Sequence, residues 1–203
     1  MIKNLIFDFG DVFLNLDKPG AMKNALDLFQ IEKLTDEMVA INCLYEQGLV
    51  STSEFMDYYI IYFPHISKQD IIDIWNYVLV EFPKYKLEFL QNLHNQNNYK
   101  LILLSNTNEL HMEWVKNKVP FYVEFKNCFE KFYLSHEINL RKPDKEIFEF
   151  VLNENKLIPS ETLFIDDTKE NTDAANQIGF HTWNIDETSQ DIVNLFTIKK
   201  DLF

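Results

Sequence analysis

The sequence predicts an α/β fold in which a core of parallel strands carries an inserted helical cap. Short apolar runs that end in polar residues alternate with helix-like segments, a pattern typical of parallel sheets covered by helices on both faces. A long stretch of helical patterns separates the first two of these runs. At 203 residues, the chain is long enough for one Rossmann-like core with a smaller insertion.

Four apolar runs bounded by turn-forming residues are predicted to be buried parallel strands. They occupy residues 3–9, 99–104, 161–165 and 180–185, and residues 131–134 are a weaker fifth candidate. Helical patterns lie between them at residues 87–95, 110–118, 143–154 and 172–178. In the third of these helices Pro143 stands near the first turn, a position that suits proline.

Residues 18–86 break this alternation and are predicted to form the helical cap. Helix candidates lie near residues 20–30, 35–47, 52–62 and 67–80. Ser51 begins a Ser-Thr-Ser-Glu capping-box pattern, and Ser67 offers a similar helix start. Since the segment is too long for a loop, we expect a cap at 18–86 and a core domain made of 1–17 and 87–203.

The composition excludes several classes of function. The net charge of −13 argues against general affinity for nucleic acid or anionic membranes. No apolar run approaches the ~20 residues of a membrane span, and the first residues lack a signal-peptide layout. Cys43 and Cys128 have no C-x-x-C spacing, so reduced thiols are expected. These features predict a cytoplasmic protein that is a monomer or a small homo-oligomer.

Two common nucleotide-binding motifs are absent. The four glycines form neither G-x-G-x-x-G nor G-x-x-x-x-G-K-[ST], so dinucleotide and P-loop folds would lack their phosphate cradle. The only arginine is Arg141. A site that required an arginine clamp would therefore have one candidate.

Polar side chains follow the ends of the predicted strands. They are Asp8, Ser105, Asn106, Asp166 and Asp167, with Lys142 a short distance after the weak strand. Sites in open α/β sheets form beyond the carboxyl ends of the strands, so we expect these groups to converge. Three carboxylates in one crevice need a cation, and oxygen-only ligation suits Mg²⁺. Together with a lysine and a hydroxyl, Mg²⁺ would neutralise a phosphoryl group.

The ordered set of motifs resembles the haloacid dehalogenase superfamily, specifically its phosphatase branch with a helical cap after the first strand. The matching stretches are FDFGDV at 7–12, LLSNT at 103–107, SHEINLRKPDKEIF at 135–148 and FIDDTKENTDAANQIG at 164–179. YEQGLVSTSEF at 45–55 is similar to the cap of this branch. In character the chain is most similar to sugar-phosphate phosphatases of the glucose-1-phosphatase type.

The resemblance implies a role for each motif residue. Asp8 would be the nucleophile that forms an aspartyl-phosphate, and it would also ligate Mg²⁺ together with the Gly10 carbonyl and Asp167. Asp166 would lie close to the metal. The remaining roles concern phosphate and support: Ser105 and the Asn106 amide would hold phosphate oxygens, Lys142 would bridge nucleophile and phosphate, and Asn171 would brace the acidic loop.

One position departs from the pattern. Phosphatases of this superfamily usually carry a second aspartate two residues after the nucleophile, which protonates the leaving group and later activates water. Here that position is Gly10, and the acid comes one residue later at Asp11. A shift of one residue redirects a side chain, so Asp11 does not simply substitute. Asp17, where the cap begins, is a second candidate for the acid/base.

The sequence thus predicts a Mg²⁺-dependent phosphatase that acts on a small phosphorylated metabolite, in particular a sugar phosphate, through an aspartyl-phosphate. A different class remains open, a catalytically weak protein that binds a phosphometabolite. A haloacid dehalogenase is a third possibility, although such enzymes use an arginine near the nucleophile and no metal. Glu46 and Tyr45 are predicted either to face the substrate from the cap or to be solvated. His136 and His181 are interpreted as structural.

Overall fold

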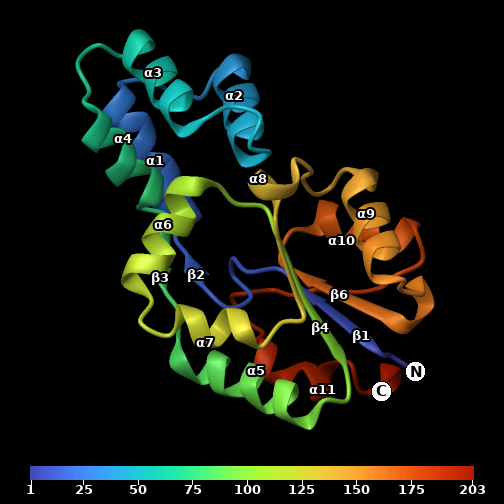
Figure 1. The fold of residues 1–203 in the computed structure, drawn as a ribbon. Coiled ribbons are helices and arrows are strands. Elements are labelled where there is room, and N and C mark those ends of the chain that lie inside the picture. The colour runs from blue at the N-terminus through green and yellow to red at the C-terminus, as the bar shows by residue number, and fades with distance from the viewer.

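The computed structural model describes residues 1–203 and confirms the predicted α/β class. Five parallel strands form one sheet in the order β5-β4-β1-β6-β7 (Figure 1). Their bounds are Asn4–Phe7 for β1, Lys100–Ser105 for β4, Lys131–Leu134 for β5, Thr162–Asp166 for β6 and His181–Asn184 for β7. All five strands coincide with predicted runs, the weak fifth candidate included.

The register of the central strands brings their carboxyl ends to one edge. Phe7 of β1 pairs with Leu103 of β4 and with Ile165 of β6. The residues that follow Phe7 and Ile165 are Asp8 and Asp166. The two carboxylates therefore leave the sheet side by side.

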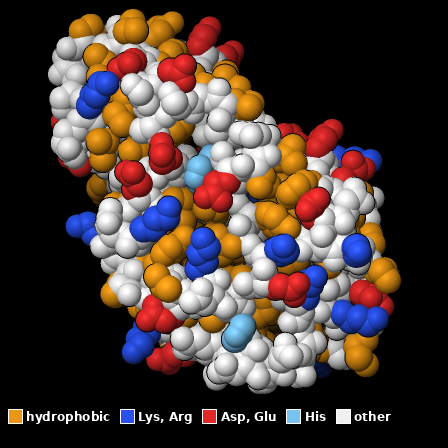
Figure 2. All heavy atoms as spheres, in the orientation of Figure 1, with side chains coloured by type: hydrophobic (Ala, Val, Ile, Leu, Met, Phe, Trp, Pro, Cys, Tyr) orange, Lys and Arg blue, Asp and Glu red, His pale blue; other side chains and the backbone are white.

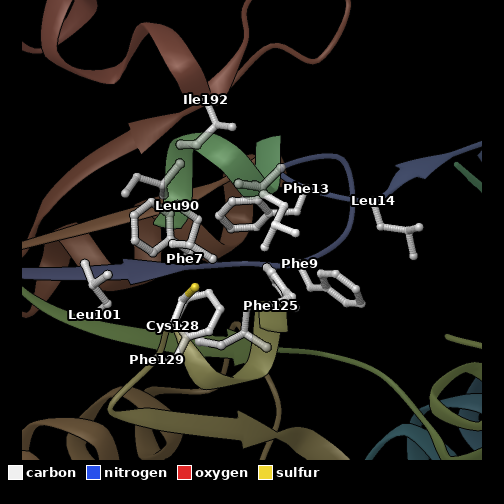
Figure 3. Packing of buried hydrophobic residues seen from close by; sticks show 14 of the residues in the cluster. Phe7, Phe9, Phe13, Leu14, Leu90, Leu101, Phe125, Cys128, Phe129 and Ile192 are labelled. Carbon is white, nitrogen blue, oxygen red and sulfur yellow. The ribbon is translucent and has the colours of Figure 1, made fainter. Parts of the chain in front are cut away.

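Helices cover both faces of the sheet. On one face lie α5 (Lys84–Gln96), α6 (Glu109–Lys118), α7 (Tyr122–Asn127) and α11 (Leu195–Ile198), and on the other α9 (Lys145–Asn155) and α10 (Lys169–Gln177). Side chains alternate between the faces along β1: Leu5 and Phe7 join the first cluster, whereas Ile6 joins the second. Figure 3 shows the first cluster, where Phe7, Phe13 and Phe125 pack together.

Four helices form a separate group beyond the carboxyl edge (Figure 1). They are α1 (Lys18–Phe29), α2 (Asp36–Glu46), α3 (Thr52–Tyr62) and α4 (Lys68–Asn76). Ser51 and Ser67 both cap their helices through complete capping boxes, as the sequence predicts. The group has its own aromatic core, in which Phe55 stacks on Tyr45 and packs edge-on against Trp75.

The predicted helix at 67–80 is too long. It ends at Asn76, and residues Leu79–Glu81 form the short strand β3, which pairs antiparallel with β2 (Asn15–Leu16). The backbone of this segment pairs with β2, so its hydrogen-bonding groups are satisfied by a neighbouring strand and not by a further helical turn. Leu79 and Phe82 pack into the core cluster under the sheet, so the chain rejoins the core before residue 86.

A short helix, α8 (Ser135–Ile138), connects β5 to the segment that carries Lys142 and contacts the end of α2. No helix of the protein has the length and apolar character needed to cross a membrane. On the face drawn in Figure 2, acidic and basic side chains are interspersed, and no extended basic patch is visible.

Candidate active site

A buried lysine joins two of the strand-end aspartates. The Lys142 ammonium lies 2.7 Å from Asp8 Oδ1 and 2.6 Å from Asp166 Oδ2, and it donates a third hydrogen bond to the Leu104 carbonyl at 2.8 Å. Its side chain is 1% exposed. All three Nζ donors are therefore satisfied at the edge where β1, β4 and β6 end.

Asn106 holds the backbone of Lys142 in place. Its Nδ2 donates to the Lys142 carbonyl at 2.8 Å, and its Oδ1 accepts from the Lys142 N–H at 2.9 Å. The side-chain amide of Asn106 is thus occupied by protein, which leaves its main-chain N–H as the amide that could meet a phosphate. Ser105, the last residue of β4, is buried at the same edge.

Asp166 is fully buried and braced from the following loop. Asn171 Nδ2 lies 3.0 and 3.1 Å from its two carboxylate oxygens, and the Thr168 N–H donates to Oδ1 at 2.8 Å. With Lys142, the carboxylate accepts hydrogen bonds from three residues. The contact of Asn171 with Asp166 is the one that a residue bracing the acidic loop would make.

The carboxylates of Asp8, Asp166 and Asp167 come together, with ligand oxygens within 4.8 Å of one another. Burial raises the pKa of Asp8 to about 7, because the lowering effect of Lys142 is opposed by Asp166 and Asp167. Burial likewise raises the pKa of Asp167 despite its ion pair with Lys18. For Lys142, burial lowers the pKa, and the two carboxylates outweigh it, so the net shift is upward.

This donor set fits Mg²⁺. All the converging ligands are oxygens, which the ion prefers, and three carboxylates exceed the positive charge of Lys142. Asp8, Asp167 and the Gly10 carbonyl would hold the ion, while Asp166 is already committed to Lys142 and Asn171.

Asp11 lies near the cluster, with its carboxylate fully engaged. It has a positive φ of 52°, its Oδ1 accepts from the Leu16 N–H at 2.8 Å, and its Oδ2 pairs with Lys18 Nζ at 2.8 Å. Lys18 also lies 2.5 Å from Asp167 Oδ2. Lys18 was not among the predicted site residues, and its contact with Asp167 joins residues 149 positions apart in the sequence.

Asp17 is not brought to the cluster. Its Oδ1 accepts from the Gly20 N–H at 2.9 Å as the N-cap of α1, and it lines a different cavity beside Tyr77 and Trp114. At Gly10, a Cβ atom would lie 2.7 Å from Leu16 Cδ1. The space that a second aspartate would enter is therefore filled by Leu16.

A cavity of about 300 Å³ is lined by residues of the four-helix group and the segment that follows it, together with His111 of α6. Mostly apolar side chains of α1, α3 and α4 line it, and its polar lining residues include Lys18, Glu46 and His111. Glu46 pairs with Arg141, whose Nη2 lies 3.1 Å from Oε2. His136 on α8 and His181 on β7 do not line this cavity; His136 Nδ1 is buried without a partner.

Two comparisons with known sequences point to one family of hydrolases. The sequence model of the haloacid dehalogenase-like hydrolases matches residues 2–179. The chain is 31% identical over 191 residues to D-ribitol-5-phosphate phosphatase of Bacteroides thetaiotaomicron, which covers 90% of this chain and 91% of that protein.

Solved structures of similar proteins superpose on nearly the whole chain. A HAD family enzyme from Bacteroides thetaiotaomicron, solved as a magnesium complex, superposes with a TM-score of 0.85 at 36% identity, covering 96% of this chain and 98% of that one. A predicted HAD-like family hydrolase from Porphyromonas gingivalis has a TM-score of 0.84 at 27% identity, covering 98% and 97%.

Proposed function

Because the chain belongs to the haloacid dehalogenase-like hydrolases, we propose that it is a Mg²⁺-dependent phosphatase that releases phosphate from a small phosphorylated alcohol. Family membership confirms the resemblance found in the sequence. The observation that carries the proposal is the buried Lys142 between Asp8 and Asp166, with Asp167 completing an oxygen-only cluster.

Asp8 is the nucleophile in this proposal. Lys142 fixes its Oδ1 at 2.7 Å, and Oδ2 is left to attack phosphorus, so that an aspartyl-phosphate forms and water then hydrolyses it. Ser105 and the Asn106 N–H would hold phosphate oxygens. Bound Mg²⁺ would supply the charge that neutralises the phosphoryl group; the relative that was solved with magnesium supports this assignment.

The leaving alcohol would occupy the cavity beneath the helices. We infer that the four helices within residues 18–76 act as the cap domain that selects it and excludes water, since Lys18 both lines this cavity and reaches Asp167. The similarity to a D-ribitol-5-phosphate phosphatase supports a sugar or polyol phosphate as the substrate class.

The dehalogenase alternative finds no support in the site. Such an enzyme needs an arginine near its nucleophile. Here Arg141 pairs with Glu46, and the cation that pairs with Asp8 is Lys142. The binding-protein alternative is an outcome of the test below.

The test is phosphate release from p-nitrophenyl phosphate and from ribitol 5-phosphate, with Mg²⁺ and with a chelator. We expect turnover only with Mg²⁺, and loss of at least 10³-fold in Asp8→Asn, since an amide cannot form the intermediate. Asp27→Asn, an exposed change on α1, is the matched control and should retain activity. Mg²⁺-independent turnover, or an active Asp8→Asn, would reject the proposal; ligand binding without turnover would favour the binding protein.

A further inference from the structure

The proposed reaction needs a proton for the departing alcohol, and Gly10 cannot supply it. We propose that Glu46, at the end of cap helix α2, donates this proton, an inference that rests on the phosphatase function proposed above. Glu46 would thereby replace the acid that related phosphatases carry beside the nucleophile.

Glu46 is linked to the aspartate cluster from two sides. Its side chain lines the cavity together with Lys18, which reaches Asp167 at 2.5 Å. From the core side, Arg141 pairs with it at 3.1 Å, and Arg141 directly precedes Lys142 in the chain. A leaving group in this cavity, attached to a phosphate on Asp8, would have Glu46 in its wall.

The backbone at this point is fixed to the core. Ser135 Oγ donates to the Glu46 carbonyl at 2.5 Å, and Asn139 Nδ2 donates to the Gln47 carbonyl at 2.8 Å. Both donors belong to α8 and the residue that ends it. The end of α2 is thus anchored beside the site, so that the carboxyl group has a defined position.

The surroundings of Glu46 favour its protonated form. Burial raises the pKa of Glu46 above its usual value, although Arg141 and Lys142 lower it. Arg141 binds Oε2, so Oε1 is the oxygen free to carry a proton. A raised pKa keeps this carboxyl group protonated to a higher pH than an exposed glutamate, as a general acid requires.

The other titratable groups of the cavity wall are committed elsewhere. Lys18 pairs with Asp11 and Asp167. Burial lowers the pKa of Lys18, but the two carboxylates raise it by more, so the net shift is upward. The Tyr59 hydroxyl donates to Asn42 Oδ1 at 2.6 Å.

His111 is not a proton donor either. Burial lowers its pKa to about 4. Its Nε2 donates to the Trp75 carbonyl at 2.9 Å, and its Nδ1 accepts from Asn108 Nδ2 at 3.2 Å. The ring is therefore neutral at pH 7 with both nitrogens engaged. Glu46 is the wall residue that remains.

Asp8 Oδ2 forms a bond to phosphorus while the bond between phosphorus and the alcohol oxygen breaks. The electron pair stays on that oxygen, which takes the proton from Glu46 Oε1, and the neutral alcohol leaves. In the second half, water passes a proton to the Glu46 carboxylate and attacks phosphorus, and the Asp8 carboxylate is released with inorganic phosphate.

The test compares kcat/KM for p-nitrophenyl phosphate, whose leaving group needs no proton, with that for ribitol 5-phosphate and glycerol 3-phosphate. In Glu46→Gln, kcat/KM for the two alkyl phosphates should fall by roughly 10²–10⁴-fold, and that for the nitrophenyl ester by less than tenfold. This parameter reports phosphoryl transfer to Asp8, so a slower attack by water does not affect it.

Arg141→Met is the matched control, because it breaks the same ion pair and keeps the carboxyl group. The alkyl phosphates should remain substrates within tenfold, and the alkaline limb of their pH profile should move to higher pH, since Arg141 lowers the pKa of Glu46.

Three outcomes would overturn the inference: equal losses of kcat/KM for aryl and alkyl esters in Glu46→Gln, no loss for alkyl esters, or the same selective loss in Arg141→Met. The last would show that the ion pair serves structure alone. Failure of the wild-type protein to hydrolyse p-nitrophenyl phosphate with Mg²⁺ would instead reject the phosphatase function, and Glu46 with it.

Discussion

At the scale of single residues, Lys142 allows three carboxylates to share one crevice. A buried charge is tolerated only when it is paired and hydrogen-bonded, and Lys142 meets this condition through Asp8, Asp166 and the Leu104 carbonyl. Lys142 and Lys18, which pairs with Asp167, do not fully compensate the cluster: burial raises the pKa of Asp8 to about 7. When no divalent cation is bound, ionisation of Asp8 therefore lowers the free energy of unfolding.

We therefore predict that Asp8→Asn changes the free energy of unfolding in a pH-dependent way when a chelator is present. The pKa of Asp8 is raised on folding, so its ionisation lowers the free energy of unfolding as pH rises from about 4 to 7. An asparagine has no such cost. We expect the variant to match wild type near pH 4 and to be more stable by about 2–4 kcal/mol at pH 8.

Urea unfolding of both proteins at several pH values between 4 and 8 measures this difference. A difference that does not change with pH, or a variant that is less stable at pH 8, would show that ionised Asp8 is well compensated by Lys142.

The strand-end residues could be predicted from sequence, but their supporting contacts could not. Asp8 and Asp166 follow apolar runs, and the carboxyl ends of parallel strands meet at one edge. By contrast, the contacts of Lys18 with Asp167 and of Asn106 with the Lys142 backbone depend on how distant segments pack. No local pattern encodes such contacts. Asp17 is different, because its contact with Gly20 is local. An aspartate followed by a proline in the first turn is an N-cap pattern, so this capping role could have been predicted from the sequence.

At the scale of elements, the junction between α2 and α8 depends on a glycine. Gly48 has a φ of +65°, and a Cβ atom there would lie 2.0 Å from the His136 carbonyl oxygen. Gly179, which follows α10, also has a positive φ, but its Cβ would meet Pro159 at 3.4 Å. Only at Gly48 does a side chain also collide with backbone.

We therefore predict that Gly48→Ala is more destabilising than Gly179→Ala. The conformational strain alone should cost about 1 kcal/mol at either position, and the collision should add at least as much at Gly48, because α8 must move. Urea unfolding of the two variants provides the measurement. Equal losses of stability would mean that α8 can move away from a side chain at position 48 without lowering the free energy of unfolding.

Element prediction succeeded where periodicity extends over several residues and failed for the shortest elements. The four helices between residues 18 and 76 were predicted from helical patterns and from the capping-box starts at Ser51 and Ser67. β2 has two residues and β3 has three, too few for an alternation to be distinguished from the end of a helix. This is why the helix that ends at Asn76 was extended to residue 80.

At the scale of the whole molecule, a net charge of −13 and the aspartate cluster make the protein sensitive to cations. A ligand that binds only the native state stabilises it by mass action. We predict that Mg²⁺ at about 100 times its dissociation constant adds about 2.7 kcal/mol and raises the melting temperature by roughly 5–10 °C.

Differential scanning fluorimetry with increasing Mg²⁺ measures this shift. Asp167→Asn should abolish most of it, whereas Asp201→Asn, an exposed carboxylate near the end of the chain, should leave it intact. A full shift in Asp167→Asn would place the bound metal outside the cluster.

In the proposed mechanism, Asp8 carries the phosphoryl group during turnover. Mass spectrometry of protein quenched in acid during steady-state hydrolysis of p-nitrophenyl phosphate tests it directly. We expect one added phosphoryl group on the peptide that contains Asp8, labile to hydroxylamine, and none in Asp8→Asn. Phosphate on another residue, or burst-phase turnover with no phosphorylated peptide, would contradict it.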